Sequence, residues 1–148
     1  MISRQKLATI LTILGSIISI AFGLWHFFVP SIWNWYSYID KTATELVLAV
    51  RAINIFFSLL LVLLGLANIL IITRKLQNRF STIVILSIST ILWMTRVILQ
   101  IIYPQGSQNI IIEYSMLLTF ILVWSCFTLS LCFVLKQNQL KQLNENIK

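Results

Sequence analysis

Four long apolar runs dominate this sequence of 148 residues. They cover about residues 7–29, 45–72, 80–102 and 111–135, and each is longer than 20 residues. A helix needs about 20 apolar residues to cross the hydrocarbon core of a bilayer, so each run is long enough for one transmembrane helix. The sequence therefore predicts an all-α integral membrane protein, a bundle of four transmembrane helices in which residues 1–148 form a single membrane domain.

The composition excludes two other classes of protein. The chain is 59% hydrophobic and 10% charged, whereas a soluble domain is about half apolar and a quarter charged. The net charge of +7 would suit a nucleic-acid-binding protein. However, the basic residues cluster at the ends of the apolar runs, where they orient membrane helices. We therefore expect membrane lipids and no nucleic acid as partners.

The basic residues also predict the orientation. With four spans, eight of the eleven lysines and arginines lie on one side: Arg4, Lys6, Arg74, Lys75, Arg79, Lys136, Lys141 and Lys148. The opposite loops carry only Lys41. Because loops rich in lysine and arginine stay in the cytoplasm, both termini are predicted to be cytoplasmic, in a multi-pass protein of a bacterial inner membrane. The polar tail, residues 136–148, is predicted to extend the last helix into water.

The first outward loop, residues 30–40, is rich in aromatic side chains. It contains Trp33, Trp35, Tyr36 and Tyr38. Aromatic rings with a polar edge favour the headgroup region, which predicts a short interfacial segment. This segment is either an aromatic belt or a lid that lines a ligand site.

Small residues recur along one face of the first span. Gly15, Ser19 and Gly23 lie four residues apart, a spacing that lets the backbones of two helices approach closely. The purely structural interpretation is a packing face within the bundle. The alternative is a contact with a second copy of the chain or with a partner membrane protein.

Polar residues gather in the predicted outer half of the bundle. The group comprises His26, Arg51, Asn54, Trp93, Arg96 and Gln100. An arginine near the middle of a bilayer costs about 2.5–3.5 kcal/mol on insertion scales, so we expect both arginines to have partners. One hypothesis pairs them with Glu45 and Glu113. The other makes the group a pocket, in which the guanidinium groups bind the head of a lipophilic anion and the aromatic residues bind its tail.

Catalytic and cofactor motifs are not evident. The chain has one histidine, His26, and its two cysteines, Cys126 and Cys132, are six residues apart in one run. This excludes a bis-histidine haem within one chain and a C-x-x-C redox pair. No metal and no cofactor is therefore predicted. One histidine and one glutamate could still perform acid–base chemistry, which makes His26 and Glu113 the candidate catalytic residues.

A family resemblance is carried by the end of the first span. The stretch Gly23-Leu-Trp-His26-Phe27-Phe-Val-Pro30 resembles the G-x-x-H-F-x-x-P signature of the DoxX-like family of small four-helix membrane proteins. The second span around Gly65 and the Thr73-Arg74 turn are also similar to that family. The resemblance implies a four-helix bundle, sometimes an accessory subunit of a membrane oxidoreductase. The family's acidic residue in the second helix and its proline-rich outer loop are not found here.

Two functional hypotheses result. The first is a non-catalytic protein, either an accessory subunit or a binder of a lipophilic anionic small molecule or lipid in a pocket facing the outer leaflet. The second is a membrane-embedded enzyme that acts on a lipid or isoprenoid-like substrate through His26 and Glu113. The sequence leaves the question of enzymatic activity open and favours the first hypothesis.

Overall fold

The structure is a computed structural model that describes residues 3–40, 42–74, 78–104 and 110–146, with side chains described up to residue 136. Every regular element in these residues is helical: α1 (Arg4–His26), α2 (Val29–Ile32), η1 (Trp35–Tyr38, a 3-10 helix), α3 (Thr44–Thr73), α4 (Arg79–Ile102) and α5 (Ile110–Asn146). Four helices are long and apolar enough to cross a membrane: α1, α3, α4 and the part of α5 up to Lys136. The prediction of four spans is confirmed, and the chain has the character of a multi-pass membrane protein.

The ends of the four candidate spans agree with the predicted spans to within about three residues, and the end of the first span is informative. The first span was predicted to reach residue 29, but α1 ends at His26, and a turn at Phe27 and Phe28 leads into α2. Pro30 lies in the first turn of α2, where a residue without a backbone N–H is tolerated. α5 continues to Asn146, which confirms that the tail extends the last helix.

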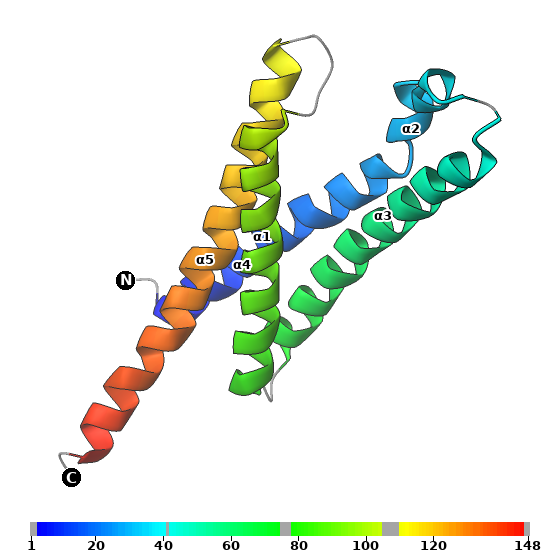
Figure 1. Cartoon of the computed structure of the whole chain (residues 1–148). Helices are drawn as coiled ribbons and strands as arrows, with labels where there is room; N and C mark the ends of the chain where they lie inside the picture. Colours follow the sequence, from blue (N-terminus) through cyan, green and yellow to red (C-terminus); the bar gives the residue numbers. More distant parts are fainter. Residues whose placement is uncertain (1–2, 41, 75–77, 105–109, 147–148) are drawn as a thin grey trace.

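The long helices pack in the spatial order α3, α1, α5, α4. α1 lies between α3 and α5, α4 packs along α5, and α3 and α4 share a smaller contact. In Figure 1, α1 and α3 run side by side toward α2, while α4 and α5 run together in another direction. The two pairs therefore diverge toward the end of the bundle that carries α2, which we call the α2 end.

Small residues allow α1 to approach its two neighbours closely. A Cβ atom on Gly23 would lie 2.8 Å from the backbone oxygen of Ser58 on α3, and one on Gly15 would lie 3.2 Å from the Cβ of Cys126 on α5. Between them, the hydroxyl of Ser19 donates to the backbone oxygen of Leu61 over 3.4 Å. The predicted packing face is thus buried inside this chain. A contact with another chain through the same three residues stays an untested prediction.

Hydrogen bonds between helices hold the end of the bundle opposite α2. The hydroxyl groups of Thr12 on α1 and Ser130 on α5 lie 2.7 Å apart. The Nδ2 of Asn68 on α3 donates to the hydroxyl of Ser89 on α4 over 2.7 Å. All four side chains are buried. One contact joins α1 to α5 and the other joins α3 to α4, so the two helix pairs are connected at that end. We call it the closed end.

Candidate functional site

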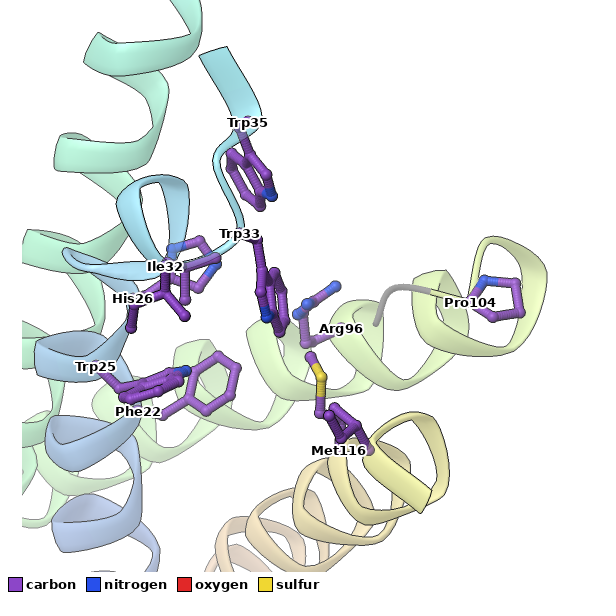
Figure 2. A pocket seen from close by; sticks show the side chains of 11 residues that line it. Phe22, Trp25, His26, Ile32, Trp33, Trp35, Arg96, Pro104 and Met116 are labelled. Carbon is purple, nitrogen blue, oxygen red and sulfur yellow. The ribbon is translucent and has the colours of Figure 1, made fainter. Parts of the chain in front are cut away.

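The aromatic segment between α1 and α3 folds back over the α2 end. Asn34 joins α2 to η1 in a left-handed conformation (φ 51°), which asparagine tolerates better than most residues. This turn directs Trp33 toward Arg96 on α4 and Met116 on α5 (Figure 2). The Trp35 ring lies near His26, with ring centroids 6.3 Å apart, whereas Tyr38 is exposed. The two tryptophans line a cavity and Tyr38 does not, and both the lid and the aromatic belt stay predictions.

The loop that follows is held by an aspartate turn. The backbone N–H and the hydroxyl of Thr42 donate to Oδ1 of Asp40 over 2.9 and 2.8 Å. These hydrogen bonds favour the carboxylate and lower the pKa of Asp40 below its ordinary value. The turn brings the chain directly to the start of α3.

A cavity at the α2 end has a volume of about 610 Å³. Figure 2 shows its walls, with α1 and α2 on one side and α4 and α5 on the other. Its lining consists of Phe22, Trp25, His26, Val29, Ile32, Trp33, Trp35, Arg96, Pro104, Ile112 and Met116. Apart from His26 and Arg96, the walls are aromatic or aliphatic. We call this space the first cavity.

Two smaller cavities adjoin the first. The second cavity, about 390 Å³, lies between α3 and α4 and is lined by His26, Trp35, Val50, Ile53, Asn54, Phe57, Arg96 and Leu99. The third cavity, about 130 Å³, is lined by Phe22, Phe57, Leu61, Leu92, Trp93, Thr95, Arg96 and Leu99. Arg96 lines all three cavities.

Arg96 is partly buried and lies on the second half of α4. Its guanidinium carbon lies 4.6 Å from the ring centroid of Phe120 on α5, a distance typical of a cation–π contact. Phe120 also packs against Phe22 and Trp93, with ring centroids 5.1 and 5.8 Å away. The guanidinium group of Arg96 therefore lies against aromatic rings, in a space whose other walls are mostly apolar.

His26 and Asn54 add polar atoms to the second cavity. The His26 ring packs against Phe57, with centroids 4.7 Å apart. Asn54 on α3 is only 6% exposed. Neither Nδ1 of His26 nor Oδ1 of Asn54 has a hydrogen-bond partner among the described residues. Both atoms have almost no accessible surface, so they contribute little to what a molecule in the cavity would meet.

The structure brings together four of the six predicted ligand residues. His26, Asn54, Trp93 and Arg96 line at least one of the three cavities. Gln100 is buried but lines none of them.

Arg51 is placed apart from this group. It is exposed, and its guanidinium carbon lies 5.4 Å from the ring centroid of Tyr36 in η1. It lines none of the three cavities. The two arginines predicted to share one ligand are therefore in different environments.

The carboxylates do not have the predicted contacts. Neither Glu45 nor Glu113 forms an ion pair in the part of the chain that the structure describes. Glu113 lies on α5 between two lining residues, Ile112 and Met116, but lines none of the three cavities itself. The structure does not bring it to His26, so acid–base catalysis by this pair stays an untested prediction.

The apolar walls were not predicted from the sequence. Phe22, Phe57 and Met116 line the cavities, yet large apolar side chains also cover the exposed surface of every span. The only sequence signal for the walls was the aromatic loop with Trp33 and Trp35. Over the described residues, no group of three or more His, Cys, Asp or Glu side chains could hold a metal ion.

Taken together, the fold and the site define a helical, multi-pass membrane protein with an apolar, arginine-containing site at one end of its bundle. Comparison with known proteins gave no match to a family model, to a curated protein or to a solved structure. The resemblance to the DoxX-like family and the role as an accessory subunit therefore stay predictions from the sequence.

Proposed function

We propose that the protein binds a lipophilic anion, a molecule with a small anionic head and an apolar tail, at the α2 end. The observation that carries this proposal is the position of Arg96, which lines all three adjoining cavities. A guanidinium group offers a planar set of donors that fits a carboxylate or a phosphate.

The remaining walls suit the apolar part of such a molecule. Ligand sites are mostly apolar, with a few polar groups that fix the orientation of the ligand. Here the apolar majority comes from side chains such as Phe22, Trp33 and Met116. His26 and Asn54 supply polar atoms next to Arg96. A purely structural arginine would not require cavities of about 610 and 390 Å³ beside it.

The orientation forms part of the proposal. The α2 end faces the outside of a bacterial inner membrane, and both termini are cytoplasmic, because the basic residues Arg4, Lys6, Arg74 and Arg79 lie at the closed end. The ligand is then taken from the outer leaflet.

Native mass spectrometry of the protein released from mild detergent tests the proposal. The two arginines provide a matched pair, since only one of them lines the cavities. We expect a bound anionic mass in the wild type and in Arg51→Gln, and its loss in Arg96→Gln. Arg96→Lys, which keeps the charge but loses the planar set of donors, should retain a weakened complex.

Two outcomes would count against an anion site at Arg96. One is the same bound mass in wild type and Arg96→Gln. The other is no bound mass in the wild type even after phosphatidic acid is added to the detergent solution. A circular dichroism spectrum of each variant checks that the helices are intact.

A further inference from the structure

The first and second cavities lie on two sides of the same polar group. They share His26, Trp35 and Arg96 and no other lining residue. The rest of the first cavity comes from α1, α2, α5 and the segments that follow α2 and α4, whereas the rest of the second comes from α3 and α4. The site therefore has one polar centre and two mostly apolar arms, with Asn54 as the polar residue of the second.

Each arm reaches the outer surface of the bundle. Trp25 and Ile32 of the first cavity are 50% and 51% exposed. Ile53 and Leu99 of the second cavity are 67% and 41% exposed. All four residues belong to spans or to the interfacial segment, so both arms open toward lipid chains.

Each arm is also large enough to hold a substantial apolar group by itself. Their volumes, about 610 and 390 Å³, both fall within the range of about 300–1,000 Å³ that is typical of ligand sites. A ligand with a single chain would make close contacts with the walls of one arm only.

We infer that the ligand is an anionic phospholipid with two apolar chains, whose phosphate meets Arg96 between the arms and whose chains occupy one arm each. This inference rests on the proposed function and specifies the ligand of the same site. The exposed lining residues of both arms support it, because a lipid can then enter from the bilayer without passing through water.

Three lipids separate the contribution of the charged head to binding from the contribution of the two chains. Phosphatidic acid has a phosphate and two chains, lysophosphatidic acid has the same phosphate and one chain, and diacylglycerol has two chains and no charge. In titrations followed by native mass spectrometry, we expect phosphatidic acid to bind roughly tenfold or more tightly than either of the others. Arg96→Gln should remove the preference for phosphatidic acid over diacylglycerol.

Tryptophan substitutions at the surface of each arm test its occupancy. Ile53→Trp narrows the second cavity and Ile112→Trp narrows the first, both at exposed positions where folding tolerates a larger side chain. Each single variant should weaken phosphatidic acid binding about tenfold. Each should leave lysophosphatidic acid almost unchanged, because the single chain can use the other arm. Leu48→Trp and Leu118→Trp, which are exposed on α3 and α5 and line none of the three cavities, are the matched controls.

The contrary outcomes separate this inference from the proposed function. If lysophosphatidic acid binds as tightly as phosphatidic acid and only one tryptophan variant weakens it, the ligand has one chain, and the anion site at Arg96 stands. If Arg96→Gln changes the binding of none of the three lipids, both proposals fail.

Discussion

The guanidinium carbon of Arg96 lies 4.6 Å from the centre of the Phe120 ring, across the contact between α4 and α5. Phe120 is fully buried, whereas Arg96 is only partly buried, so the contact is partly shielded from water. A cation over an aromatic ring gains about 0.5–1 kcal/mol at an exposed site and about 2 kcal/mol when it is desolvated. Phe120 therefore helps α5 to accept a charged residue from α4, and it restricts the directions from which an anion can reach the guanidinium group.

Replacing Phe120 should weaken ligand binding as well as stability. In Phe120→Leu the ring below Arg96 is lost, so the guanidinium group is less fixed, and we expect roughly tenfold weaker binding of phosphatidic acid. Phe127→Leu is the control, since Phe127 is equally buried but packs near Gly15, toward the closed end. Each variant should lose about 1–3 kcal/mol of stability. Equal loss of binding in both would contradict a specific role of Phe120.

Gly23 should not tolerate a side chain. A Cβ at this position would lie 2.8 Å from the backbone oxygen of Ser58, so α1 and α3 must move apart. We expect Gly23→Leu to lower the stability by about 1–3 kcal/mol in unfolding by sodium dodecyl sulfate. Ala21→Leu, at an exposed position of the same helix, is the control and should be nearly neutral. A neutral Gly23→Leu would mean that α1 and α3 do not pack as described.

The hydrogen bond from Asn68 to Ser89 should be measurable as a coupling energy. A double-mutant cycle of Asn68→Leu and Ser89→Ala isolates the contact, which measures 2.7 Å and joins α3 to α4. Hydrogen bonds between membrane helices contribute about 0.6 kcal/mol on average, so we expect a coupling of that size. Additive single effects would show that the two side chains do not interact in the folded protein.

The orientation can be tested by cysteine labelling. In a background of Cys126→Ser and Cys132→Ser, Tyr38→Cys introduces an exposed thiol in η1 and Gln5→Cys one near the start of α1. A maleimide that cannot cross membranes should label Tyr38→Cys in intact cells, and Gln5→Cys only after permeabilisation. The reverse pattern would place the α2 end in the cytoplasm.

The sequence was sufficient to predict the spans because a membrane helix is defined mainly by its length and hydrophobicity. It placed the end of the first span three residues too late, since Phe27, Phe28 and Val29 are as apolar as the helix before them. Hydrophobicity alone does not distinguish a turn in that stretch from a further helical turn. Pro30 marks the change.

Part of the candidate site was predicted because polar residues inside apolar spans are conspicuous. The rest was not predicted, because the spacing of these residues does not determine how each helix is rotated in the bundle. Asn54 and Arg51 are three residues apart, about 60° around a helix. A small rotation therefore places Asn54 in the second cavity and leaves Arg51 beside Tyr36. Apolar lining residues such as Phe57 carry no such signal, because lipid and protein interior favour the same side chains.

The spatial order α3, α1, α5, α4 differs from the order in which a ribosome makes these helices. α4 has the lowest mean hydropathy of the four candidate spans, 2.0, and it carries Arg96. Its most extensive contact is with α5, the last of the described helices to be synthesised. During biosynthesis α4 thus leaves the ribosome before α5, so Arg96 emerges ahead of Phe120. The first cavity, which Ile112 and Met116 of α5 help to line, can be completed only after α5 has been inserted.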